Sequence, residues 1–324
     1  MRDSDDSDVG IVDKEAPELL QRVEELWFED GTLIIEARGT AFRVYAGLLS
    51  ARSSVFRDMM SIPQPESSAS HSCPTVTLHD SPQDLTHFFK AIMDSQYFEP
   101  PPYKTNLSII TGVLRLSTKY DVPYLRRRAL MHLDCSYPST SLKAWDARGP
   151  VRTIPPIINT PFMLLCLARE VDVPWIMPQL MYCVSGLPMP ILEGILWDEI
   201  QVKPSEQDQK LLIVGRSELA YLQNRFIFNT LRFKSDDFCA DPEEARFQLL
   251  GAALSTKEIH ALGRFGHEQL KPYKEDMCES CNTEWNSRLD SARREVWNRL
   301  PSVFGYSDWE ELNKLRTLDL GITD

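Results

Sequence analysis

A helix-corner pattern that occurs twice constrains the fold of this chain more than any other feature of its sequence. Residues 114–130 read LRLSTKYDVPYLRRRAL, and residues 165–181 read LCLAREVDVPWIMPQLM. In both copies leucine occupies the first and third positions, and Asp-Val-Pro is followed by an aromatic residue. Each proline holds the preceding valine in an extended conformation and suits the first turn of a following helix. The pattern therefore predicts two helix–corner–helix units.

The aspartates of the two corners are predicted to cap the second helix of each unit. Asp121 and Asp172 precede the valines that lead into Pro123 and Pro174. A carboxylate at such a position accepts N–H groups that have no partner within the helix. Two units of this kind can stack on a shared core, as in helical repeats. Local convergence on one favourable corner explains the repeat equally well, and both interpretations stay open at this point.

The segment before the first unit has the pattern of a small sheet followed by short helices. Alternating or β-rich residues predict strands at residues 32–37, 40–45 and 75–78. Apolar residues at helical spacing then predict two short helices that break at Ser53. Another helix is expected to start after Ser81, because Pro82 fits a first helical turn. Phe42 and Phe56 are the expected core residues of this part.

These motifs together resemble the BTB/POZ domain. The resemblance rests on FRVYAGLLSARSSVFRDMM, VTL, LTHFFKAIM and LRLSTKYDVPYLRRRAL, which occur in the order and spacing of that family between residues 27 and 133. The phrase FRDMMSIPQP is similar to a large fungal, basidiomycete-type set of BTB proteins. The resemblance implies an α+β fold, with a short β-sheet flanked by helical hairpins, and a role in protein–protein interaction.

The chain departs from the BTB pattern after its second strand. The family usually has histidine where Tyr45 stands, and often a lysine or arginine at Ala46. In dimeric members that basic residue faces the aspartate that matches Asp30, across a charged pocket. The resemblance therefore predicts that Asp30 lacks its usual cationic partner.

The segment APELLQRVEELWF, which precedes the BTB-like motifs, is predicted to form an amphipathic helix. Leu19, Val23, Leu26 and Trp27 recur at helical spacing and would form an apolar stripe. In dimeric BTB proteins a leading helix of this kind packs across the partner, so the resemblance implies a weak homodimer. Packing of the stripe on its own domain is the alternative.

Four regions are expected along the chain. Residues 1–16 are acidic and polar, which predicts a disordered tail. The BTB/POZ domain is assigned to residues 17–135, and a Pro-rich linker, pinned to a domain surface by Trp145, to residues 136–160. Residues 161–324 are predicted to form a mostly α-helical domain.

The net charge and the cysteines indicate which kinds of partner the chain can bind and in which compartment it resides. The net charge of −12 argues against nucleic acid, and the basic residues around Arg126–Arg128 are expected to form a solvated helix face. No apolar run is long enough to span a membrane. Seven cysteines, an odd number, without a secretion signal predict reduced thiols in the cytoplasm or nucleus.

Catalytic motifs of the common enzyme families are absent, so the chain is predicted to be neither an enzyme nor a cofactor-binding protein. Cys278 and Cys281 have C-x-x-C spacing, and Cys239, His260 and His267 lie upstream. Such thiolates can bind zinc. Without a second C-x-x-C, buried reduced thiols are the favoured interpretation, and no bound metal is expected.

The leading functional hypothesis is a non-enzymatic interaction module that binds itself or another protein. An adaptor for a cullin-type ubiquitin ligase is an alternative implied by the family. The hydrophobic-x-Glu pattern frequent in such adaptors is absent before Glu66. A transcription-associated regulator and a metal-binding or redox protein are further alternatives, although no zinc-finger array or basic region supports the former.

Overall fold

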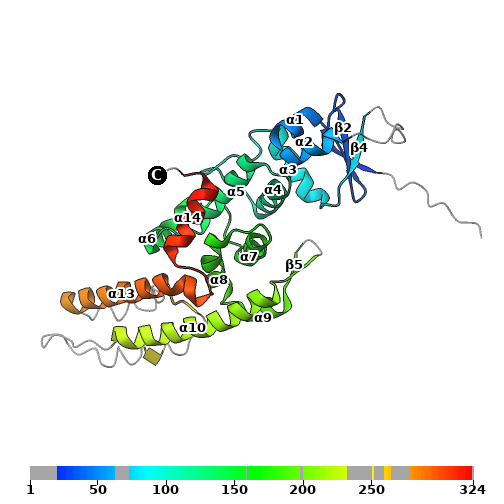
Figure 1. Cartoon of the computed structure of the whole chain (residues 1–324). Coiled ribbons are helices and arrows are strands. Elements are labelled where there is room, and N and C mark those ends of the chain that lie inside the picture. The colour runs from blue at the N-terminus through cyan, green and yellow to red at the C-terminus, as the bar shows by residue number, and fades with distance from the viewer. Residues whose placement is uncertain are drawn as a thin grey trace, which may run out of the picture.

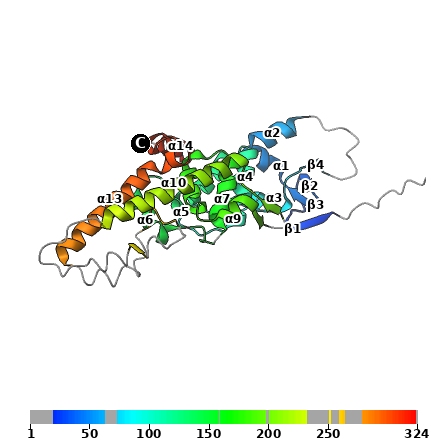
Figure 2. The same ribbon diagram turned by 90° about the horizontal axis from the view of Figure 1, so that it is seen from below.

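A β-hairpin followed by short helices builds one end of the molecule, as the sequence predicts. The computed structural model describes residues 20–62, 73–157, 159–197, 200–231, 250–251, 259–263 and 278–322. These residues form an α+β structure with a small mixed sheet and mostly helices. The sheet lies at one end, and two long helices lie side by side at the other (Figures 1 and 2).

The sheet has the strand order β1-β3-β2-β4. The strands are β1 (Gln21–Trp27), β2 (Leu33–Ala37), β3 (Thr40–Val44) and β4 (Thr75–Thr77). β2 and β3 pair antiparallel, whereas β1 pairs parallel with β3 and β4 parallel with β2. Arg38 and Gly39 join the hairpin at φ of 45° and 81°. Two positive φ angles match the right-handed twist of the flanking strands, which explains this tight turn.

The predicted leading helix is wrong, because the segment forms strand β1. Gln21 N donates to Gly39 O at 2.8 Å, and Phe28 N donates to Arg43 O at 2.9 Å. Pairing with β3 thus overrides the helical spacing of Val23, Leu26 and Trp27. Leu19 lies outside the described residues. Leu26 is buried, while an irregular register between Arg22 and Trp27 interrupts the ladder.

Five α-helices follow the hairpin among the described residues of the N-terminal half. They are α1 (Ala46–Arg52), α2 (Ser54–Ser61), α3 (Pro82–Met93), α4 (Leu107–Lys119) and α5 (Pro123–Ser136). The predicted break is confirmed, since Ser53 Oγ accepts the Phe56 N–H at 3.0 Å and caps α2. The predicted start after Ser81 is also confirmed, with Pro82 as the first residue of α3. Phe42 and Phe56 are fully buried.

The C-terminal half is largely helical, with one small hairpin that the sequence analysis missed. Within its described residues the elements are α6 (Leu142–Val151), α7 (Thr160–Glu170), the 3-10 helix η2 (Pro174–Ile176), α8 (Met177–Val184), α9 (Pro188–Glu193), β5 (Ile195–Trp197), β6 (Ile200–Val202), α10 (Glu206–Leu231), α13 (Glu279–Val303) and α14 (Trp309–Leu320). α10 and α13 pair along their length, and α14 returns to lie against α5 (Figure 1).

The segment expected to be a linker is packed into the structure. Residues 136–160 contain α6, and Trp145 within it is only 3% exposed. Its ring lies 6.1 Å from the rings of both Tyr182 and Trp297. Buried apolar residues form one cluster that extends from Leu26 to Leu320. The two halves therefore share a core, while the expected boundaries stay predictions and residues 1–16 lie outside the described residues.

The prediction that the corner aspartates cap the second helices is wrong. Asp121 and Asp172 have φ of 50° and 52°, in the left-handed region. Val122 N donates to Ser117 O at 2.8 Å, and Val173 N donates to Ala168 O at 2.9 Å. These bonds define a Schellman motif, in which the left-handed residue terminates the preceding helix. The aspartates thus close α4 and α7 rather than open the helices that follow.

The prolines do begin the second helix of each unit. Pro123 is the first residue of α5 and Pro174 the first of η2. In the second copy Pro178 follows one turn later. It has no N–H for the bond to residue 174 and its ring disfavours a continuous α-helix there. The second copy therefore starts as a 3-10 turn before α8.

Candidate protein interaction surfaces

Asp30 and Tyr45 form an exposed pair at the sheet end of the molecule. Tyr45 OH donates to Asp30 Oδ1 at 2.8 Å, and its ring lies 4.9 Å from that of Phe28. This hydrogen bond, with the nearby negative charge, raises the pKa of Tyr45. Beside it, the N–H of Ala46 donates to Thr32 Oγ1 at 3.1 Å. The tyrosine that departs from the family pattern thus becomes the partner of the aspartate, which the sequence analysis did not foresee.

The first corner is tied to α2 by two serines. Ser53 Oγ donates to the carbonyl of Tyr120, and Ser54 Oγ donates to Asp121 Oδ2. The ring of Tyr120 stacks on Phe56 with centroids 4.7 Å apart. Burial and a hydrogen bond to Asp80 raise the pKa of the Tyr120 hydroxyl. The corner therefore fixes α2 against the α4–α5 hairpin.

The second corner and the first unit are both held by α14. Trp175 Nε1 donates to Asp319 Oδ2 at 2.8 Å, and Arg126 Nη2 donates to Asp319 Oδ1 at 3.4 Å. Nearby, Arg316 makes a bidentate pair with Asp134 of α5, with both N–O distances 2.6 Å. The Asp319 carboxylate of α14 thus links the start of the second helix in one copy to that in the other. The two repeated units therefore lie side by side against α14.

Three residues of the basic cluster around the first corner are engaged in ion pairs. Arg115 binds Asp84 and, at 2.7 Å, Glu170. Lys119 binds Asp80 at 2.6 Å, and Arg126 pairs with Asp319 as described. The prediction of a solvated helix face is therefore wrong for Arg115 and Arg126, which are partly buried and join neighbouring helices, whereas Lys119 is exposed.

The outer face of α10 is apolar and exposed. Its large side chains are Ile213, Val214, Tyr221 and Phe228, which are 47%, 66%, 57% and 51% exposed. The last three recur every seven residues, and Ser217 and Asn224 lie between them on the same side. This set is here called the α10 face, and it is flanked by Glu218 and Arg225, which pair with Arg299 and Glu295 of α13. Exposed patches of this kind on helices are typical of interaction sites.

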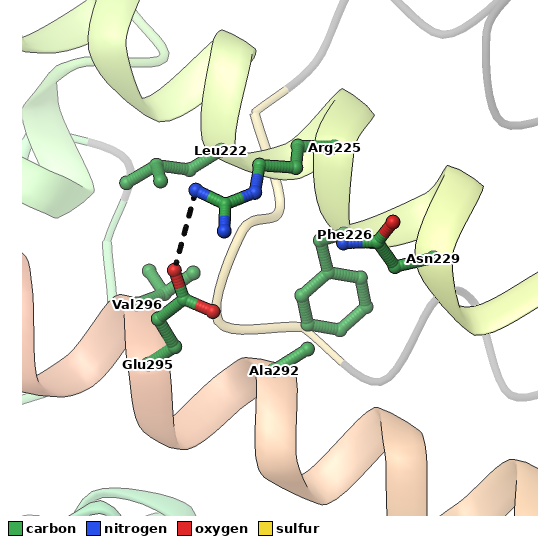
Figure 3. A pocket seen from close by; sticks show the side chains of 7 residues that line it. All are labelled: Leu222, Arg225, Phe226, Asn229, Ala292, Glu295 and Val296. Carbon is green, nitrogen blue, oxygen red and sulfur yellow. Dashed lines mark ion pairs between the residues drawn. The ribbon is translucent and has the colours of Figure 1, made fainter.

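The opposite side of α10 is filled by α13. Figure 3 shows Phe226 directed toward Ala292, beside an ion pair between Arg225 Nη1 and Glu295 Oε1 at 3.6 Å. The crevice between these helices has a volume of about 30 Å³. That space accommodates one or two waters and no larger ligand. Within the part of the chain that the structure describes, α13 therefore leaves the side chains of the outer face partly exposed.

A larger cavity lies between α7 and the start of α10, with a volume of about 190 Å³. Arg169 in its wall binds Asp208 in a bidentate manner, at 2.5 and 3.1 Å, and also Tyr306 OH at 2.6 Å. Burial raises the pKa of the Cys166 thiol to about 12. The thiol is thus protonated at neutral pH and is not a ready nucleophile.

The C-x-x-C pair lies at the start of α13. Cys278 is the N-cap residue, and its Sγ accepts the Cys281 N–H at 3.4 Å. Neither cysteine is in a disulfide. Of the upstream candidates, Cys239 and His267 lie outside the described residues. Within the described ranges, no three His, Cys, Asp or Glu residues are grouped so that they could hold a metal ion.

Comparisons of the chain with protein-family models, with curated proteins and with solved structures found no match. Among the helices of the described residues, none has both the length and the apolar character that a membrane crossing requires.

Proposed function

We propose that the chain is a non-enzymatic protein-interaction module, composed of a BTB/POZ-type N-terminal domain and a helical C-terminal half that share one core. The order of elements supports the proposal. A hairpin, two short helices, a strand parallel to β2, and the α4–α5 hairpin follow one another as the resemblance implies. BTB/POZ domains serve protein–protein interaction, and the resemblance carries that role to this chain as an inference.

Self-association through a leading helix has no basis in the structure, because that segment is β1. The exposed edge of β1 is also poorly suited to pairing with another strand. Arg22, Glu24 and Glu25 are exposed along it, and its register is irregular. Charges and bulges are features that discourage edge-to-edge association. A contact surface is therefore better sought elsewhere on the molecule.

We propose that the α10 face is the contact through which two copies of the chain associate. Val214 and Phe228 lie seven residues on either side of Tyr221. In an antiparallel helix pair centred on Tyr221, each valine would oppose the phenylalanine of the second copy. A two-fold interface requires such a self-complementary surface. In the same register Ser217 would oppose Arg225 of the second copy and Asn224 would oppose Glu218, and both of these charged residues form ion pairs with α13.

The test compares two tyrosine variants of the full chain by sedimentation or light scattering. Tyr221→Glu places a charge at the centre of the α10 face, whereas Tyr103→Glu changes a tyrosine of similar exposure, 61%, outside it. We expect the parent and Tyr103→Glu to dimerise and Tyr221→Glu to be monomeric. A monomeric parent at ~100 μM, where micromolar association is measurable, would refute self-association. Equal dimerisation of both variants would place the contact away from α10.

A further inference from the structure

Two arginines at the end of α6 have no carboxylate partner in the part of the chain that the structure describes. Arg148 and Arg152 lie one helical turn apart, and the Arg152 N–H donates to Arg148 O at 3.0 Å. Asp146, the nearest acidic residue in sequence, is held by Arg293 at 2.5 and 3.0 Å. Both arginines are partly buried. Such charges are unfavourable without a counter-charge.

Other arginines that link helices in this protein are paired. Arg115, Arg169 and Arg316 each bind at least one carboxylate at 2.7 Å or less. The pair on α6 differs from these, since its two guanidinium groups repel each other. Burial and the charge of Arg152 lower the pKa of Arg148. Two neighbouring, partly buried cations of this acidic protein thus form no ion pair within the described residues.

Among the described groups around the arginine pair, the charge of Asp146 acts on Arg148, but this carboxylate forms its ion pair with Arg293. Lys104 Nζ donates to the carbonyl of Arg152, which brings a third cation to the end of α6. Tyr137 and Cys183 are close enough for their pKa values to respond to both arginines. Burial nevertheless raises the pKa of Tyr137 and raises that of Cys183 to about 11. Both side chains are therefore neutral near pH 7.

The Arg148 guanidinium is held in place. It lies 3.5 Å above the ring centroid of Trp145, and its Nη1 donates to the carbonyl of that residue. The Nε atoms of Arg148 and Arg152 are buried without a partner, and within the described residues no hydrogen bond is formed by Arg148 Nη2 or by either Nη atom of Arg152. The stacked Arg148 guanidinium, together with the unused N–H donors of both arginines, suits planar or tetrahedral oxyanions.

We propose that Arg148, Arg152 and Lys104 form a binding site for a phosphate dianion. Three cations that form no ion pair within the described residues match a doubly charged phosphate better than a single carboxylate. The bound group can be free phosphate or the phosphate of a phosphorylated side chain, because both present the same oxygens. The site is remote from the α10 face in sequence and does not depend on self-association.

The test titrates inorganic phosphate and, separately, O-phosphoserine into the full chain at constant ionic strength. Binding is followed by calorimetry and by the fluorescence of Trp145 and its neighbours. The double variant Arg148→Gln/Arg152→Gln is compared with Arg52→Gln/Arg57→Gln, which removes the same charge from exposed positions of α1 and α2. Circular dichroism and thermal unfolding verify that each variant is folded.

We expect saturable binding that is weakened at least ~10-fold in the α6 variant and unchanged in the control. Tighter binding of O-phosphoserine than of phosphate would assign the site to a phosphorylated side chain, and the reverse to free phosphate. Absence of saturation at ~10 mM ligand, or equal loss in both variants, would overturn the proposal. A response reproduced by chloride alone would also overturn it, because it would reflect general screening.

Discussion

Replacing Asp172 by glycine should stabilise the folded chain, whereas replacing it by alanine should destabilise it. The residue adopts φ of 52° and terminates α7 through the bond from Val173 N to Ala168 O. Its side chain is exposed. Glycine reaches this conformation without the steric cost of a Cβ atom, and aspartate tolerates it better than alanine does.

The expected magnitudes follow from the left-handed conformation. Relief of the Cβ contact is worth about 1 kcal/mol, and the freedom of glycine in the unfolded chain removes roughly half of that gain. Asp172→Gly should therefore raise the free energy of unfolding by about 0.5 kcal/mol. Aspartate is several-fold enriched in this region, which corresponds to about 0.8 kcal/mol relative to alanine. The glycine and alanine variants should differ by roughly 1–1.5 kcal/mol.

Asp121 provides an internal comparison, because its carboxylate also accepts the Ser54 hydroxyl. Glycine at this position removes the strain together with a bond worth about 0.5–1.5 kcal/mol, so the net change should be near zero or unfavourable. In a double-mutant cycle, Ser54→Ala should lower stability in the parent and have little effect in Asp121→Gly.

Equilibrium urea unfolding followed by tryptophan fluorescence measures these differences. The sign of the change in the free energy of unfolding for Asp172→Gly distinguishes a left-handed helix terminus from a helix N-cap. A helix N-cap would lose a few tenths of a kcal/mol on change to glycine and about 0.5–2 kcal/mol on change to alanine. If Asp172→Gly proves less stable than the parent, to the same extent as Asp172→Ala, the argument from the left-handed conformation is refuted.

Three further outcomes test the packing described above. Trp145→Ala should lower the free energy of unfolding by about 3–5 kcal/mol in urea titrations, whereas a tryptophan in an exposed linker would leave it unchanged. His132 is fully buried, and burial lowers its pKa, so the unfolded chain binds a proton more readily. Stability should therefore fall as pH drops below about 6.5, by at most ~1.4 kcal/mol per pH unit from this group, and His132→Asn should reduce that slope in urea titrations at several pH values. Cys278→Ser should keep or slightly raise the free energy of unfolding, because serine is a better N-cap than cysteine. If elemental analysis finds one zinc per chain that is lost in this variant, Cys278 is a metal ligand and not only a helix cap.

Features determined by local chemistry were predictable from the sequence. The β2–β3 hairpin follows from alternation and the Arg38-Gly39 turn, and the starts of α2 and α3 follow from serines whose side chains bond nearby N–H groups. The segment 21–27 was not predictable in this way, because its spacing suits a helix and only the free edge of β3 makes it a strand.

The functions of the corner aspartates were also not evident. An aspartate between two helices can cap the second or terminate the first, and the choice depends on its backbone angle. The proline two residues beyond each aspartate was a usable signal, since proline commonly follows a Schellman motif. For residues 136–160 the prolines and polar residues predicted a linker that Trp145 pins to a surface, but the burial of Trp145 between Tyr182 and Trp297 depends on tertiary contacts.

The candidate surfaces depend on tertiary contacts that a sequence pattern does not contain. Leu212 and Val214 are both apolar residues of α10, yet the first is buried and the second is 66% exposed. Their difference arises from the position of α13 along one side of the helix. Arg148 and Arg152 likewise become notable only because Asp146 is occupied by Arg293, which is 147 residues away.

The bridge made by Asp319 has a consequence for synthesis on the ribosome. Its partner Arg126 is translated 193 residues earlier. At ~5–20 residues per second, that separation corresponds to roughly 10–40 s of elongation. During this interval the side of α5 that α14 later covers, and the indole N–H of Trp175, remain without their final partners. A nascent chain stalled before Trp309 should therefore present this surface to chaperones, while the released chain should hide it.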